Sequence, residues 1–246
     1  MHADATSVSE QPAALMRVAA LTKRYGDQLA LDDISFDVHA GEVLGLIGPN
    51  GAGKTTLLEA ITGLLPVDGG DIVWCGTPFP PARRRDSIFY LPDGVRPYGE
   101  QYVARVLSFF AGVYGRSAPE VADVVADVGL APVLQKRVHA LSKGFSRRMM
   151  WAIGLLAPHR LLLMDEPFDG FDLKQGRDMM VLLRRLAADG RTLILSIHQL
   201  LDAERVCDRI VLIDQGRVRG VGTLDDLRAQ TGLSSGNLED VFLALT

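Results

Sequence analysis

The segment between residues 48 and 56 has the residue pattern of a phosphate-binding loop. Its glycines would let backbone N–H groups turn toward phosphate oxygens, its lysine would reach the β- and γ-phosphates, and the hydroxyl after the lysine would bind Mg²⁺. A strand over 41–48 and a helix over 54–64 are expected on either side, as such a loop requires. The loop alone does not distinguish ATP from GTP. We predict that the nucleotide is bound by Gly48, Pro49, Asn50, Gly51, Ala52, Gly53, Lys54, Thr55 and Thr56.

Two carboxylates follow an apolar run farther along the chain. The run over 161–164 is expected to be a buried strand, and it leads into Asp165 and Glu166. Asp165 would hold Mg²⁺, and Glu166 is placed to polarise an attacking water. His198 follows another expected strand and could contact a γ-phosphate, although a lone histidine there is more often structural. With Lys54, these residues predict a site that hydrolyses nucleotide.

Strands and helices alternate around these motifs. Strands are expected at 16–21, 34–38, 71–75, 87–91, 161–165, 192–197 and 209–213, and helices at 54–64, 145–157, 173–188 and 200–206. This alternation predicts a parallel sheet with crossover helices, in the α/β class. A turn region is expected over 23–33. A proline-containing loop over 76–85 carries an arginine triplet, which could contact a partner or lipid headgroups but is expected to be solvated.

The segment over 93–150 has a different pattern. From Gly99 to about Val138 it indicates amphipathic helix, because apolar residues recur at helical spacing. It therefore predicts a helical insert in the α/β core. The apolar face around 98–110 could receive a helix from a membrane protein, or it could pack inside the insert. The residues that define this face are Val103, Leu107, Phe110 and Tyr114.

Composition indicates a folded protein without a nucleic-acid partner. Hydrophobic residues make up 48% of the 246 residues, enough for a sizeable core, and the formal net charge of −4 lacks the basic excess of nucleic-acid binders. Cys75 and Cys207 lack the spacing of a disulfide framework or of a zinc site. This cysteine usage fits a protein of the reducing cytosol. No apolar run approaches the ~20 residues of a membrane helix, and no secretion signal precedes residue 14. We expect a cytoplasmic protein.

The segment Leu141-Ser142-Lys143-Gly144-Phe145 resembles the LSGGQ signature of ABC ATPases. Ser142 precedes Asp165 by 23 residues and opens an expected helix, where Ser142 or Ser146 could also be a simple N-cap. In that family the signature contacts the γ-phosphate held by the opposite subunit, so Ser142 and Gly144 are assigned to nucleotide binding.

Three further positions agree with the resemblance. Tyr25 lies 29 residues before Lys54, where the family has an aromatic residue that stacks on adenine. Asp172 matches the D-loop aspartate, which communicates across the dimer. His198 lies 32 residues after Glu166 and matches the switch histidine.

Two departures from the family pattern stand out. Asp93 occupies the place of the Q-loop glutamine, where a carboxylate is a good Mg²⁺ ligand but adds negative charge near the triphosphate. We assign Mg²⁺ to Thr55, Asp93 and Asp165 on this basis. Lys143 and Phe145 replace a glycine and the glutamine of the signature, as in the single-domain subunits of ABC-2-type exporters.

The resemblance implies a P-loop NTPase (RecA-like) core with a mixed sheet, an N-terminal antiparallel β subdomain and the helical insert. We expect a flexible tail over 1–14, a core over 15–92 and 151–221, a helical subdomain over 93–150 and short C-terminal helices over 222–246.

In function, the resemblance implies an ATPase subunit that dimerises head to tail around two Mg-ATP. A homodimer is expected to work on the cytoplasmic face of the membrane with an integral membrane permease, in export. The alternative is a soluble ABC-type ATPase that acts on ribosomes or DNA. A GTPase would need an NKxD segment, which is not found in this sequence.

Overall fold

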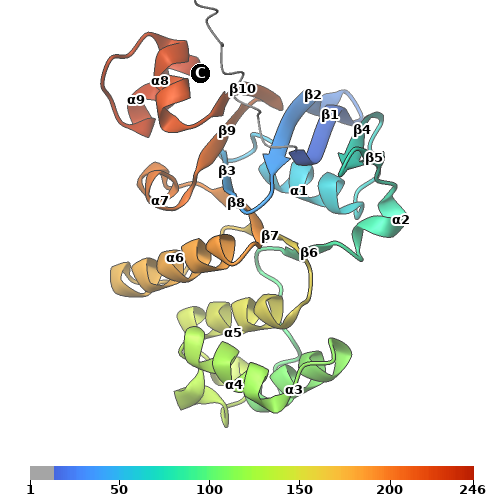
Figure 1. The fold of residues 1–246 in the computed structure, drawn as a ribbon, viewed down its shortest axis with the longest axis vertical. Coiled ribbons are helices and arrows are strands. Elements are labelled where there is room, and N and C mark those ends of the chain that lie inside the picture. Colours follow the sequence, from blue (N-terminus) through green and yellow to red (C-terminus); the bar gives the residue numbers. More distant parts are fainter. Residues whose placement is uncertain (1–13) are drawn as a thin grey trace, which may run out of the picture.

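The computed structural model describes residues 14–246, and its centre is a six-stranded mixed sheet (Figure 1). The strand order is β10-β9-β3-β8-β7-β6, in which only β10 is antiparallel to its neighbour. The predicted tail lies outside the described residues except for Ala14, which begins β1. The strands are β3 (Val43–Ile47), β6 (Ile88–Leu91), β7 (Leu161–Asp165), β8 (Thr192–Ile197), β9 (Arg209–Asp214) and β10 (Arg217–Gly222).

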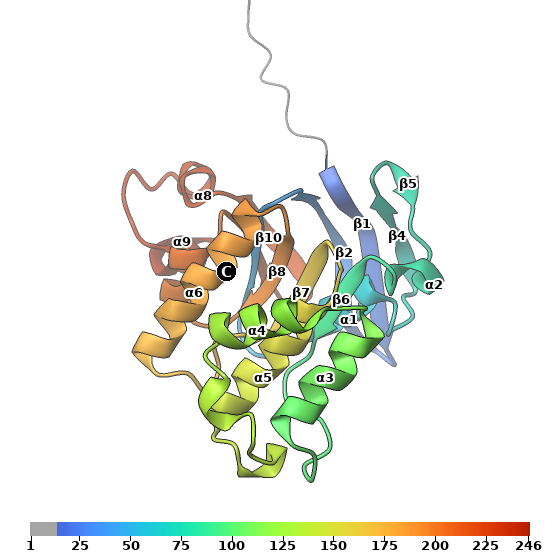
Figure 2. The same ribbon diagram turned by 60° about the horizontal axis from the view of Figure 1, so that its bottom comes forward.

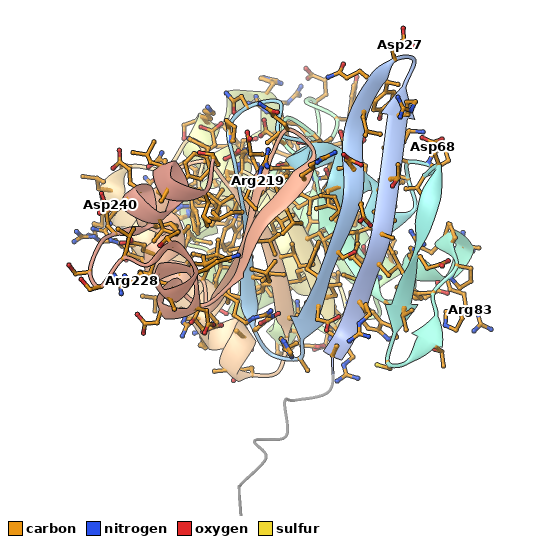
Figure 3. The ribbon with its side chains drawn as sticks, turned by 90° about the horizontal axis from the view of Figure 1, so that it is seen from above. Asp27, Asp68, Arg83, Arg219, Arg228 and Asp240 are labelled. Atoms are coloured by element: carbon orange, nitrogen blue, oxygen red, sulfur yellow. The ribbon has the colours of Figure 1, made fainter. Side chains whose placement is uncertain are left out.

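A second sheet of four antiparallel strands contains the N-terminal part of the chain. Its order is β2-β1-β4-β5, with bounds Gln28–His39, Ala14–Tyr25, Gly69–Trp74 and Thr77–Pro78. The turn region expected over 23–33 is wrong, because both strands continue to a tight turn at Gly26 and Asp27, at the tip of the hairpin in Figure 3. Polar residues at the hairpin end hid its pairing, which joins Lys23 to Leu31 and Tyr25 to Gln28.

Helices cover the central sheet on both faces because its strands are apolar on both sides. Leu161 and Leu163 of β7 belong to a cluster with α1 (Lys54–Thr62) and the second sheet. Leu162 and Met164 point to the opposite cluster, with α6 (Leu173–Ala188) and α7 (Leu200–Val206). A fully buried apolar strand of this kind is typical of parallel sheets.

The insert is a group of helices at one end of the molecule (Figure 2). It contains α3 (Val103–Val113), α4 (Ala118–Asp127), short 3₁₀ turns at Ala131–Val133 and Val138–Ala140, and α5 (Lys143–Leu156). The amphipathic pattern is therefore divided between α3 and α4, and a capping box at Ser117 starts the second helix. Val103 and Leu107 are buried, whereas Phe110 and Tyr114 pack partly exposed against the same cluster. Helix α5 continues past residue 150 and joins the insert to the core.

Two helices end the chain, α8 (Leu224–Thr231) and α9 (Leu238–Leu245). Both begin with capping boxes, at Thr223 and Asn237, and they bury Leu227, Leu238 and Val241. No helix within residues 14–246 has the length and apolar character needed to cross a membrane.

The expectation of a solvated arginine triplet is wrong for its central member. The loop over 76–85 contains β5 and a short helix, α2 (Pro81–Arg84), and Arg84 is only 6% exposed. Its guanidinium donates to the carbonyl oxygens of Phe79 at 2.8 Å and Ala60 at 2.7 Å, and so binds the last turn of α1. Arg83 and Arg85 are exposed, and Figure 3 shows Arg83 at the edge of the molecule.

We expect Arg84→Met to lower the free energy of unfolding by about 2 kcal/mol, because two buried carbonyl oxygens lose a charged donor. Arg83→Met is the matched control, and it should stay within about 0.5 kcal/mol of the unmodified chain. Urea denaturation measures both. Equal midpoints for the two variants would contradict a stabilising role for the buried guanidinium.

Candidate nucleotide site

The predicted phosphate loop connects β3 to α1, and its glycines are needed for two different reasons. At Gly48 a Cβ atom would lie 2.1 Å from the carbonyl oxygen of Ile213, because β9 passes close to the loop. At Gly53 the backbone has a φ of 105°, which side chains rarely adopt. The loop thus leads directly into the N-terminus of α1, where free backbone N–H groups favour anions.

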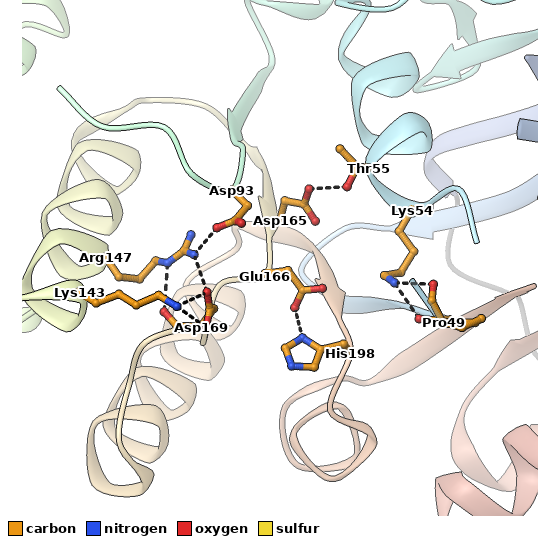
Figure 4. A network of polar contacts seen from close by, with 11 residues as sticks. Pro49, Lys54, Thr55, Asp93, Lys143, Arg147, Asp165, Glu166, Asp169 and His198 are labelled. Carbon is orange, nitrogen blue, oxygen red and sulfur yellow. Dashed lines mark hydrogen bonds and ion pairs between the residues drawn. The ribbon is translucent and has the colours of Figure 1, made fainter. Parts of the chain in front are cut away.

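Lys54 folds back over this loop. Its ammonium donates to the carbonyl oxygens of Gly48 at 2.7 Å and Pro49 at 3.1 Å, and the residue is 7% exposed (Figure 4). Burial lowers the pKa of Lys54, while the charges of Glu166 and Asp165 act in the opposite direction. A cation held here over the loop is positioned to exchange its carbonyl partners for phosphate oxygens.

Thr55 and Asp165 meet although they lie far apart in the sequence. The Thr55 hydroxyl donates to the Asp165 carboxylate at 2.7 Å, and Asp165 is 4% exposed at the end of β7. Mg²⁺ is commonly held by one or two carboxylates together with water and nucleotide phosphates. The described residues contain no cluster of three or more His, Cys, Asp or Glu side chains that could form an all-protein metal site. One hydroxyl and one carboxylate beside the phosphate loop therefore fit Mg²⁺ held jointly with a nucleotide.

Glu166 and His198 form a contact between the ends of β7 and β8. The Glu166 carboxylate contacts Nδ1 of His198 (Figure 4). Glu166 also has a φ of 48°, and its N–H donates to the carbonyl oxygen of Ser196 at 3.1 Å. A positive φ at a residue with a side chain is strained and is often found at functional sites. With this backbone conformation the carboxylate lies in the lining of a cleft, in contact with His198.

A cleft of about 660 Å³ brings most of the predicted residues together. Tyr25 lies at its margin, 49% exposed, with the Lys23 ammonium 5.3 Å from its ring centre. The predicted residues that line the cleft are Tyr25, Asn50, Gly51, Gly53, Lys54, Thr55, Thr56, Asp93, Asp165 and Glu166.

Sequence reasoning missed two other parts of the lining. Gln28, Leu29 and Ala30 come from the first hairpin, while Gln215 and Gly216 come from the turn between β9 and β10. A Cβ atom on Gly216 would lie 2.7 Å from the carbonyl oxygen of Ala30, so the two segments touch. The only local signal is the glycine of an ordinary turn, which does not indicate the approach of a distant hairpin.

Ser142, Gly144 and Asp172 are absent from the cleft lining. Ser142 accepts a hydrogen bond from the N–H of Phe145 at 3.3 Å, as the simple N-cap of α5. Asp172 is likewise the N-cap of α6 and accepts from the N–H of Gln175 at 2.8 Å. In Figure 4, Lys143, which follows Ser142, lies across Asp165 and Glu166 from Lys54. The chain therefore keeps its signature segment apart from its own phosphate loop.

Asp93 borders the cleft, but its carboxylate is paired with a cation. The guanidinium of Arg147 donates to Asp93 at 2.5 Å, and the Asp93 side chain is 50% exposed (Figure 4). The assignment of Asp93 to Mg²⁺ remains a prediction. To bind the cation, the carboxylate would have to leave Arg147 or contact both.

Comparison with known proteins extends the likeness beyond the motifs. A family model described as ABC transporter matches residues 31–169. The Nod factor export ATP-binding protein I of Burkholderia orbicola is 38% identical over 203 residues, which cover 79% of this chain and 66% of that protein. The linearmycin resistance ATP-binding protein LnrL of Bacillus subtilis is 32% identical over 224 residues, covering 89% of this chain and 72% of that protein.

A solved structure gives the same result for the fold. A structure described as the ATP-binding subunit of an ABC transporter matches with a TM-score of 0.85 and 33% sequence identity, covering 94% of this chain and 99% of that chain. The predicted P-loop fold and the resemblance to ABC ATPases are confirmed, and the roles of single residues stay predictions. The chain belongs to the ABC transporter family, as an ATP-binding subunit that hydrolyses ATP.

Proposed function

We propose that two copies of this chain close head to tail around two ATP molecules, each with Mg²⁺. The observation that carries the proposal is the separation of Ser142 and Gly144 from the cleft that contains Lys54. If both segments contact one nucleotide, the signature must come from a second copy. In a symmetric dimer, each copy would supply its phosphate loop to one nucleotide and its signature segment to the other. Both sites would then be complete without a third copy.

In the proposed reaction, the residues around the cleft act on the terminal phosphate. Lys54 neutralises charge on the β- and γ-phosphates, and Glu166 accepts the proton of the attacking water. Thr55 and Asp165 would hold Mg²⁺, which when bound neutralises charge on the phosphate oxygens. His198 contacts the Glu166 carboxylate in this structure, and with nucleotide present it would turn to the γ-phosphate and free that carboxylate.

We further propose that ATP-driven closure moves a separate membrane subunit, in export. Two relatives, identical to this chain at 38% and 32% of the aligned positions, are named for Nod factor export and linearmycin resistance. The apolar face predicted at Val103, Leu107, Phe110 and Tyr114 packs inside the insert. Other apolar side chains of the insert are exposed. The exposed set, suited to a helix of a membrane protein at the cytoplasmic face, consists of Val95, Tyr98, Tyr102, Phe109 and Val113.

Glu166→Gln should bind ATP, accumulate as a dimer with ATP present, and lose turnover by at least about 100-fold, because the amide cannot accept the proton from water. Phosphate release measures turnover, and light scattering with and without ATP measures the dimer. Glu239→Gln, at an exposed position on α9, is the matched control and should behave as the unmodified chain. Full ATPase activity in Glu166→Gln would rule out this residue as the base.

Ser142→Arg should prevent ATP-dependent dimerisation, even when combined with Glu166→Gln, because the long side chain would occupy the space of the partner's nucleotide. ATP binding to the monomer should remain, since Ser142 lies outside the cleft of its own chain. Ser142→Ala removes the same helix cap, worth about 1 kcal/mol, without adding bulk, and it serves as the control for folding. A double variant that dimerises as well as Glu166→Gln alone would contradict a shared site.

A further inference from the structure

Four charged side chains form a connected cluster beside the nucleotide cleft, and they come from three segments of the chain. Asp93 follows β6, Lys143 and Arg147 belong to the first turns of α5, and Asp169 lies between β7 and α6 (Figure 4). The Lys143 ammonium contacts the two Asp169 carboxylate oxygens at 3.0 and 2.8 Å. The hydrogen bond from Lys143 lowers the pKa of Asp169, so this carboxylate stays ionised.

Arg147 is the member that joins the segments. Its Nη2 lies 2.5 Å from the Asp93 carboxylate and 3.9 Å from that of Asp169, and its Nε donates to the Asp169 carbonyl oxygen at 3.3 Å. The Arg147 side chain is 9% exposed, against 50% for Asp93. A buried guanidinium held by several oxygens is the fixed partner, and the half-exposed carboxylate is the one that can move.

Asp93 stands between two spaces. It borders the nucleotide cleft, which also contains Thr55 and Asp165. It also borders a smaller cavity of about 240 Å³ that is lined by Lys143, Arg147 and Asp169. Rotation of one exposed side chain can therefore place its carboxylate toward either space.

We infer that Arg147 is a positioning residue that competes with the divalent cation for the carboxylate of Asp93. The inference rests on the proposed placement of Mg²⁺ at Thr55 and Asp165. While Arg147 holds Asp93, the segment after β6 is tied to the signature helix α5. When the cation attracts Asp93, that tie is released. The two events are linked. Removing the Arg147–Asp93 contact must therefore increase the improvement in nucleotide binding that the cation causes, by the free energy with which the contact opposed it.

A general electrostatic effect would give a different pattern. Removing any cation near the cleft strengthens the binding of Mg²⁺ through the loss of repulsion. Lys143 has the same charge and lies in the same cluster, but its contacts are with Asp169 and not with Asp93. Lys143→Gln is therefore the matched control for Arg147→Gln, and Asp93→Asn removes the group for which the competition occurs.

The experiment measures the dissociation constant of a fluorescent ATP analogue with Mg²⁺ and with EDTA, in protein that carries Glu166→Gln and Ser142→Arg, so that neither hydrolysis nor the expected ATP-dependent dimerisation interferes. The dissociation constant with EDTA divided by that with Mg²⁺ reports how much Mg²⁺ improves binding. Arg147→Gln should raise this ratio roughly three- to fivefold, the upper end of what ion pairs near the surface contribute, because the guanidinium is buried. Lys143→Gln should change it less than about twofold, and Arg147→Gln should have no effect on it when combined with Asp93→Asn.

The inference would be overturned if Arg147→Gln raised the ratio equally with Asp93 present and with Asp93→Asn. A fall of the ratio in Arg147→Gln would overturn it as well. If Arg147→Gln does not fold, as judged by thermal melting without nucleotide, Arg147→Met takes its place. A methionine fills much of the buried volume but has no donor for the Asp93 carboxylate, so the ratio should again rise, and an unchanged ratio would overturn the inference. Absence of any Mg²⁺ effect before Arg147 is altered would instead overturn the proposed metal placement.

Discussion

The parallel alignment of β3, β6, β7 and β8 is the constraint on which the nucleotide cleft depends. Parallel strands end at the same edge of a sheet, so the segments that follow them meet there even when they are far apart in sequence. The phosphate loop follows β3, Asp93 follows β6, Glu166 follows β7 and His198 follows β8. The hydrogen bond between Thr55 and Asp165 spans 110 positions of sequence for this reason alone.

The alignment itself is held by burial on both faces of the sheet. Alternate residues of β7 enter two separate apolar clusters, so a shift of one residue would exchange the clusters that its side chains enter. This register fixes which residues lie at the strand ends, and therefore which side chains reach the cleft. The strained backbone of Glu166 is tolerated because the strand before it is fully buried and paired on both sides.

Helix α5 has a double role in this arrangement. Its C-terminal part is buried in the core, where Trp151 donates to the carbonyl oxygen of Pro167, and its N-terminal part carries the signature segment. The Arg147 contacts connect that exposed end to two loops at the edge of the cleft. If the cation draws Asp93 from Arg147 as proposed, a change at the cleft would reach the signature through helix α5 and these polar contacts, without rearrangement of the sheet.

The amino-acid sequence by itself determined the family, the phosphate loop, the two acids at the end of β7 and most of the α/β elements. These features are local, since short motifs and apolar periodicity need no knowledge of distant contacts. It failed where polar composition concealed pairing, as in the hairpin around Gly26, and where a charged residue was buried by remote carbonyl groups, as at Arg84.

Only the tertiary structure decided which residues share one space. It brought Gln215 and Gly216 to the cleft beside Tyr25, left Ser142 outside it, and paired Asp93 with Arg147. Each of these outcomes concerns segments separated by dozens of residues, and whether they meet is set by strand order and helix packing rather than by local preference. For that reason the sequence could name the chemical groups of the site, while the fold determined which partners those groups have.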